Sequence, residues 1–199
     1  MRMVNLAGVC IVGLLAMSAS AAPINFYANL DGPSEAPPNA SPGTGYAFVS
    51  FDPVAHTLLV NIIFEGLLGT TTASHIHVIN GPGDTNTADT TGPVATTTPN
   101  FLGFPLGVTA GSYSRTLDTL DATSYRAGWI TDSGGTTALA EAALFAGISD
   151  GRAYVNIHSS VFGGGEIRGF LQPAPEPSTM LLLSAAMGGL LLLRRKRQA

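Results

Sequence analysis

The stretch Gly45–Gly66, "GYAFVSFDPVAHTLLVNIIFEG", decides the fold class of this chain. Its first part is rich in aromatic and β-branched residues, which favour strands. Its last part alternates, and one face of that strand would be formed by Leu58, Val60, Ile62 and Phe64. Between the two parts, Asp52–His56 ("DPVAH") has the composition of a turn. The stretch therefore predicts a β-hairpin with one buried face.

The same alternation recurs on both sides of this hairpin. Further strands are predicted at Ile24–Leu30, Ala73–Ile79, Gly111–Leu117, Arg152–His158 and Glu166–Leu171. One segment, Thr136–Gly151, has apolar residues at helical spacing and predicts a single short helix. Residues 84–99 are rich in threonine and predict a long exposed loop. Many short strands with one helix predict an all-β fold, a Greek-key β-sandwich.

The first 21 residues have the pattern of a secretory signal peptide. Arg2 precedes an apolar run, and small residues at Ala19–Ala21 suit cleavage after Ala21. A retained membrane anchor is the alternative, although the apolar run is short for a membrane span of about 20 residues. The only cysteine, Cys10, lies in this segment. The mature chain would therefore have no disulfide and would depend on packing for its stability.

The last segment, residues 173–199, predicts a membrane anchor with a sorting motif. Pro175, Glu176 and Pro177 precede the apolar run Met180–Leu193, and the basic cluster "RRKR" follows it. This order predicts a short transmembrane helix with its basic end in the cytoplasm. It resembles a PEP-CTERM sorting signal, which is processed by an exosortase, an integral-membrane cysteine protease. An ordinary tail anchor is the alternative.

The resemblance to PEP-CTERM proteins implies a location and partners. It implies export, transient anchoring in the inner membrane by the C-terminal helix, and a final place in the cell envelope, at the outer surface or outside the cell. An exosortase-like enzyme would be the processing partner. Because such proteins occur mostly in bacteria that make exopolysaccharide, exopolysaccharide is a further candidate partner.

Residues 22–172 are long enough for one domain with a single core. This segment holds twelve acidic side chains and only four arginines, which argues against binding to nucleic acid or to an anionic lipid surface. It contains no cysteine, no G-x-S-x-G motif and no phosphate-binding glycine motif. The sequence thus favours a protein without enzymatic activity.

The stretch "TASHIHVING" contains two of the four histidines of the chain. In a strand, His75 and His77 would share one face and Ile76 and Val78 the other. His158, in "RAYVNIHS", would follow the same alternation on a second strand. If the strands pair, three imidazoles could hold copper or zinc with one open position, their nitrogens about 3–4 Å apart. Binding should then weaken below about pH 6. Solvated histidines, or histidines bonded to carbonyls, are the alternative.

Five separated blocks extend the interpretation from the histidines to the whole domain. They are "LDGPSEAPP" at 30–38, "GTG" at 43–45, "ASHIHV" at 73–78, "GRAYVNIH" at 151–158 and "GGEIRG" at 164–169. Together they resemble a CHRD domain, the module named after chordin and common in secreted bacterial proteins. That family has no well-established biochemical activity, so the resemblance implies a non-catalytic binding or structural module.

A weaker similarity concerns the Cu/Zn superoxide dismutase fold. It implies that His75, His77 and His158 match copper ligands and that Arg168 matches the anion-steering arginine, with Glu166 as a second-shell candidate. A structural ion pair across the sheet is the alternative for Glu166 and Arg168. The bridging histidine and the disulfide of that fold have no counterpart. A copper-dependent redox protein is therefore the alternative function, and a carbohydrate-binding module with Tyr27, Tyr46 and Tyr113 is a third.

Overall fold

A computed structural model describes residues 22–86, 88 and 90–175 of the chain. The predicted signal peptide and the tail beyond Pro175, including Glu176, Pro177 and the predicted transmembrane helix, lie outside the described residues. Among the helices of the described part, none has the length and apolar character needed to cross a membrane.

The described chain consists mainly of strands. In order, its elements are β1 (Ile24–Asp31), β2 (Thr44–Asp52), β3 (Thr57–Glu65), β4 (Thr71–Val78), β5 (Gly111–Asp118), the 3₁₀ turn η1 (Ala122–Ser124), α1 (Ala127–Asp132), α2 (Thr137–Ser149), β6 (Ala153–Ser159), β7 (Ile167–Phe170) and β8 (Gln172–Pro173). All the predicted strands are present, within a few residues of their predicted ends.

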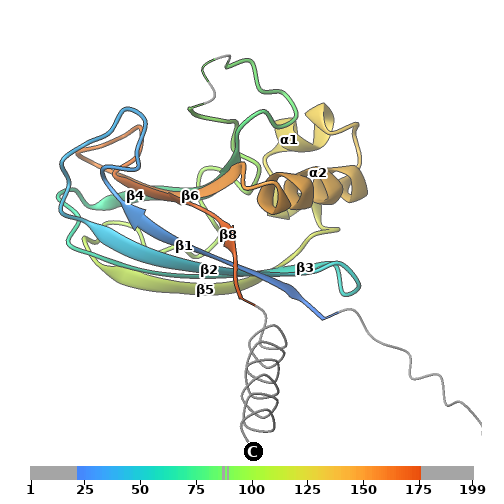
Figure 1. The fold of residues 1–199 in the computed structure, drawn as a ribbon, viewed down its shortest axis with the longest axis horizontal. Coiled ribbons are helices and arrows are strands. Elements are labelled where there is room, and N and C mark those ends of the chain that lie inside the picture. Colours follow the sequence, from blue (N-terminus) through green and yellow to red (C-terminus); the bar gives the residue numbers. More distant parts are fainter. Residues whose placement is uncertain (1–21, 87, 89, 176–199) are drawn as a thin grey trace, which may run out of the picture.

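The strands form one antiparallel path in the order β4-β6-β7-β1-β2-β3-β5, and β8 pairs with β1. The path curls over itself, so that β1, β2, β3 and β5 form one layer and β4, β6 and β7 form the other (Figure 1). The two halves are joined where Asp31 of β1 pairs with Arg168 of β7. The prediction of an all-β, sandwich-like fold is confirmed, with the two layers being halves of one curled sheet.

The hairpin that decides the fold class forms as predicted. β2 and β3 pair without a break from Thr44 opposite Glu65 to Asp52 opposite Thr57. The side chain of Asp52 closes the turn by accepting hydrogen bonds from the backbone amides of Val54 and Ala55. The inward-facing side chains of both layers are buried and make up the core, among them Phe26, Val49, Phe51, Val60, Ile62, Ile76, Val155 and Ile157.

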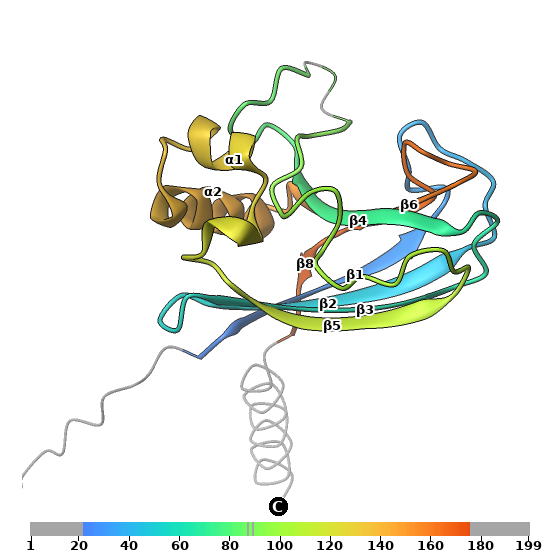
Figure 2. The same cartoon turned by 180° about the vertical axis from the view of Figure 1, so that it is seen from behind.

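The prediction of a single helix was incomplete. The predicted helix is α2, which begins where the side chain of Thr136 accepts a hydrogen bond from the amide of Leu139. The structure adds η1 and the six-residue helix α1, which is too short to show helical periodicity. Packing fixes α1, because Trp129 is fully buried and its Nε1 donates to the carbonyl of Ala140. Both helices lie at one end of the two layers, as Figure 2 shows from behind.

The prediction of an exposed loop over residues 84–99 was wrong for residues 92–97, which are buried or half-buried. Ala95 and Thr96 are fully buried, because the chain there runs along the open edge of β4. The amide of Ala95 donates to the carbonyl of Ile76, and the amide of Phe101 donates to the carbonyl of Ser74. Backbone pairing and burial thus replace the solvent contact that the threonine-rich composition predicted. The segment covers the strand that carries His75 and His77.

Candidate metal site

The pairing of β4 with β6 brings the three predicted histidines to one face. His75 lies opposite Asn156, His77 opposite Tyr154, and His158 opposite Ala73. Directly paired residues of antiparallel strands share a face, so all three imidazoles stand on the outer side of this layer. The alternating neighbours, which include Ile76 and Val155, are fully buried on the core side, as predicted.

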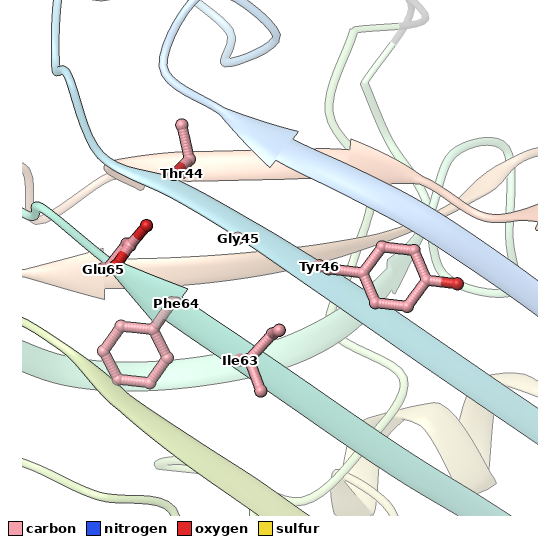
Figure 3. Close-up of a pocket in the computed structure, with 6 residues that line it drawn as sticks. All are labelled: Thr44, Gly45, Tyr46, Ile63, Phe64 and Glu65. Atoms are coloured by element: carbon pink, nitrogen blue, oxygen red, sulfur yellow. The ribbon is translucent and has the colours of Figure 1, made fainter.

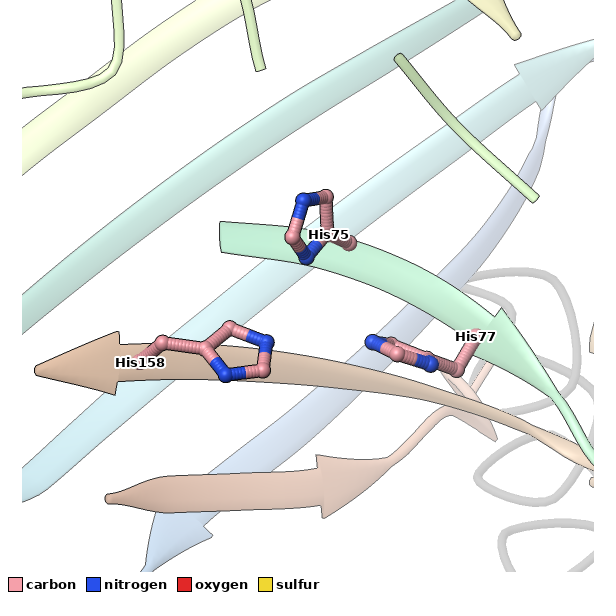
Figure 4. Close-up of side chains that lie close together, drawn as sticks. All are labelled: His75, His77 and His158. Carbon is pink, nitrogen blue, oxygen red and sulfur yellow. The ribbon is translucent and has the colours of Figure 1, made fainter. Parts of the chain in front are cut away.

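The rings of the three histidines point toward a common centre (Figure 4). The ring centroids of His75 and His158 are 5.3 Å apart, those of His75 and His77 5.6 Å, and those of His77 and His158 6.1 Å. One ligand nitrogen from each ring lies within 4.8 Å of the other two. Nitrogens around a tetrahedral Zn²⁺ are roughly 3.3 Å apart, so small side-chain rotations would complete a metal geometry.

Backbone carbonyls hold the opposite nitrogen of every ring. Nε2 of His75 lies 2.7 Å from the carbonyl oxygen of Pro99, Nδ1 of His77 lies 2.9 Å from that of Gly92, and Nδ1 of His158 lies 2.9 Å from that of Gly163. A carbonyl only accepts hydrogen bonds, so each of these nitrogens carries the ring proton. The carbonyls thereby fix the tautomer and orientation of all three rings, which is how second-shell groups prepare histidine ligands.

The remaining nitrogen of each ring has a lone pair and no partner among residues 22–86, 88 and 90–175. These atoms are Nδ1 of His75, Nε2 of His77 and Nε2 of His158, and all three are shielded from solvent without a hydrogen bond. Buried polar atoms of this kind call for an unseen ion or water. A water molecule has two hydrogens and would satisfy two of the three lone pairs, whereas one cation can accept all three.

Burial keeps the cluster neutral. Desolvation lowers the pKa of His75 and of His77 to about 4, against an ordinary value of 6.5, and it outweighs the opposing hydrogen bonds to Pro99 and Gly92. Burial also lowers the pKa of His158. The free nitrogens therefore stay unprotonated near neutral pH, which is the state that binds metal. The predicted onset of protonation near pH 6 moves to lower pH for this reason.

Arg168 stands on the same face but does not face the histidines directly. Its guanidinium carbon lies 4.9 Å from the ring centroid of Tyr154, and the Tyr154 ring stacks in turn on His77, with 4.9 Å between centroids. Arg168 also donates to the carbonyls of Ser34 and Thr90. These contacts use two of the five N–H donors of Arg168, and the anion-steering role that the dismutase similarity implied stays a prediction.

Glu35 is the acidic partner of Arg168, with 3.9 Å between Nε of the arginine and a carboxylate oxygen. It also accepts a hydrogen bond from Asn156 at 2.8 Å. Burial raises the pKa of Glu35 to about 7 even though the charge of Arg168 opposes this shift. Sequence patterns did not single out Glu35, because it lies in an irregular proline-rich segment without periodicity.

Glu166 does not join the histidines and forms no ion pair with Arg168. It is fully buried, and its carboxylate accepts hydrogen bonds from the hydroxyl of Ser41 and the amides of Leu68 and Gly69. Burial by itself would raise the pKa of Glu166, but its hydrogen bonds bring the pKa below the ordinary value. Glu166 thus fastens the turn before β4 and has a structural role.

The groups that sequence reasoning missed are the carbonyls of Gly92, Pro99 and Gly163. Every residue has a carbonyl, so no residue pattern identifies these three. The one local signal is Gly92, where an added Cβ would lie 2.1 Å from the carbonyl oxygen of Val78. Only glycine lets the backbone come this close to β4, and this approach brings the Gly92 carbonyl to His77.

Fold and site together define an all-β domain with a three-histidine cluster on its outer face. A family model described as the CHRD domain matches residues 26–171, which is more than half of the chain. The chain therefore belongs to the CHRD domain family. Such domains are typically extracellular, which is consistent with export. Neither the curated proteins nor the solved structures include a significant match to the chain.

Proposed function

We propose that this protein is an exported, non-catalytic binding module whose CHRD domain holds one Cu²⁺ or Zn²⁺ ion between His75, His77 and His158. The observation that carries the proposal is the set of three converging, buried nitrogens without partners, each on a ring oriented by a backbone carbonyl. Three neutral imidazoles suit both ions, and Cu²⁺ should bind more tightly by the usual order of divalent metals.

The ion would add a link between parts of the domain that already pair through backbone hydrogen bonds. Its ligands lie on β4 and β6, and their second-shell carbonyls lie on the segment 92–99 and the turn at Gly163. The chain has no cysteine after Cys10, so no disulfide can link these segments. Binding at a hundredfold excess over the dissociation constant would stabilise the domain by about 2.7 kcal/mol.

The alternative is a copper-dependent redox protein. One feature favours the binding module over it: the free nitrogens are shielded from solvent. One assay distinguishes the two functions, because only a redox protein loaded with copper would consume superoxide.

Export and sorting complete the proposal. The tail from Pro175 onward would direct an exosortase-like enzyme to the protein after the signal peptide has taken it across the inner membrane. In the producing cell, replacing Pro175, Glu176 and Pro177 with alanine should leave the protein unprocessed and membrane-associated. An unchanged mature mass and location would contradict the sorting role.

Calorimetric titration of Cu²⁺ and Zn²⁺ into the purified protein tests the metal site. Wild type should bind one ion, and His77→Ala or His158→Ala should reduce the affinity at least about a hundredfold. His56→Ala is the matched control, because His56 lies outside the cluster, with Nδ1 3.0 Å from Glu141. Equal affinity in wild type and both cluster variants would refute the site, whatever the control does.

A further inference from the structure

The outer face of the other layer carries a second unusual surface. The register of β1, β2, β3 and β5 places outward side chains in three rows across the four strands: Asn25, Ser50, Leu59 and Thr116; Tyr27, Phe48, Asn61 and Ser114; Asn29, Tyr46, Ile63 and Ser112. None of the twelve is charged. We call this surface the aromatic face. It lies on the opposite side of the core from the histidine cluster.

Aromatic rings form a platform near the middle of this face. The rings of Tyr27 and Tyr46 are nearly parallel, at 20°, with their centroids 6.4 Å apart. In the close-up view onto β2 and β3, the broad side of the Tyr46 ring is turned toward the viewer (Figure 3). Tyr46 is 40% exposed and Ile63 beside it is 58% exposed. Both side chains leave a large part of their apolar surface open to solvent.

Two shallow pockets open on the same face. One, of about 340 Å³, is lined by Thr44, Gly45, Tyr46, Ile63, Phe64 and Glu65 (Figure 3). The other, of about 310 Å³, reaches past Phe48 and Asn61 to Ser112 and Ser114. Both include Tyr46 and Ile63, so the two hollows lie side by side and share one apolar wall.

We propose that the aromatic face binds a neutral polysaccharide. A sugar ring has an apolar C–H side that packs on an aromatic ring and an edge of hydroxyls that both donate and accept hydrogen bonds. The aromatic face can make both kinds of contact, because it combines the rings of Tyr27, Tyr46 and Phe48 with neutral amide and hydroxyl groups. The three rows extend over roughly 13 Å along the strands and roughly 14 Å across them, enough for two or three sugar units.

Charge and composition favour this ligand over others. A polyanion needs lysine or arginine, which the aromatic face lacks, and the acidic domain would repel it. A protein interface is usually enriched in aromatic residues, methionine and arginine and depleted in serine. The aromatic face shares only the first of these features. Arginine and methionine are missing from the three rows, whereas serine occurs three times.

Native gel electrophoresis in gels containing soluble neutral polysaccharides tests the proposal. The probes are barley β-glucan, hydroxyethylcellulose, dextran and galactomannan, with alginate as the charged comparison. At least one neutral polymer should retard the protein. Tyr27→Ala and Tyr46→Ala should each weaken that binding about tenfold, as expected for the loss of one aromatic contact. Tyr46→Phe should retain most of the binding, because it keeps the ring.

Two further variants make the test independent of folding defects in the tyrosine variants. Ile63→Lys places a charge at an exposed position on the aromatic face and should also weaken binding. Leu139→Ala removes a side chain that is 48% exposed on α2, away from the face, and should have no effect. Chelation of metal should likewise leave polysaccharide binding unchanged, which separates this proposal from the metal site.

Three results would overturn the proposal. They are retardation by none of the four neutral polymers, equal retardation of wild type and Ile63→Lys, and retardation by alginate alone. A concentration-dependent dimer in sedimentation that Ile63→Lys abolishes, with no binding to any polymer, would instead assign the face to self-association.

Discussion

Nδ1 of His77 lies 2.9 Å from the carbonyl oxygen of Gly92, and this hydrogen bond decides which nitrogen of His77 is free. Because Nδ1 donates, the lone pair is on Nε2, the atom that is buried without a partner. The proposed metal site thus depends on the path of the segment that follows residue 90 as much as on the histidines. Tyr154 helps to position Gly92, since its hydroxyl accepts a hydrogen bond from the amide of Gly92.

Gly92→Ala should therefore weaken metal binding by about ten- to a hundredfold, the usual effect of losing a second-shell contact. The added Cβ would lie 2.1 Å from the Val78 carbonyl oxygen, so the segment must move away from His77. Gly163→Ala is the matched control. Gly163 also supplies a carbonyl, to His158, but an added Cβ meets nothing within 4 Å. Calorimetry that finds the same affinity for both variants would contradict the positioning role of Gly92.

The stability of the metal-free protein should fall as the pH is lowered from 7 toward 4. The pKa of His75 and His77 is about 4 in the folded protein and near 6.5 when unfolded. Between these values the unfolded chain binds protons that the folded chain does not, so acidification favours unfolding. Glu35 has the opposite effect. Its folded pKa of about 7 lies above the ordinary 4.5, so its contribution to stability is lost as the pH rises through that window.

Urea unfolding of the metal-free protein at pH 7.0 and pH 4.5 separates these contributions. Relative to wild type, the loss of stability on acidification should be smaller in His77→Gln and larger in Glu35→Gln. Each substitution removes one titrating group from a buried position. Identical losses in wild type and His77→Gln would mean that His77 is not held neutral by burial.

Glu166→Gln should destabilise the fold without affecting the metal. The carboxylate accepts through both of its oxygens, from Ser41 and Leu68 at one and from Gly69 at the other, whereas glutamine has a single acceptor oxygen. At least one of these donors would lose its partner, and a buried unsatisfied group costs about 1–3 kcal/mol. Glu65→Gln, at an exposed position of β3, should change stability little. Thermal unfolding measures both. A Glu166→Gln protein as stable as wild type, or one with weaker metal binding, would refute the structural role of Glu166.

Much of the fold could be predicted from alternation, because a strand with one buried face repeats every two residues. The same rule placed His75, His77 and His158 on one face before their strands were known to pair. Helix α1 could not be predicted, because its six residues are too few to show the helical spacing of apolar residues. Its position depends instead on the buried ring of Trp129. The burial of Ala95 and Thr96 was also missed, since backbone pairing with β4 outweighs a polar composition.

The tautomers and the lowered pKa values of the three histidines could not be predicted from the sequence. The sequence predicted that the three rings converge, and their closeness agrees with that prediction. The carbonyls that set the tautomers come from distant segments, and the lowered pKa values come from a covering segment that composition marked as exposed. Glu166 and Arg168, two positions apart, have separate partners in Ser41 and Glu35.

The most direct test of the metal site is a crystal structure of the protein with Zn²⁺, measured with anomalous scattering at the zinc edge. The account predicts one strong peak between β4 and β6, about 2.0–2.1 Å from Nδ1 of His75, Nε2 of His77 and Nε2 of His158. A map with no peak there, with zinc only at other positions such as His56 and Glu141, would contradict the central claim.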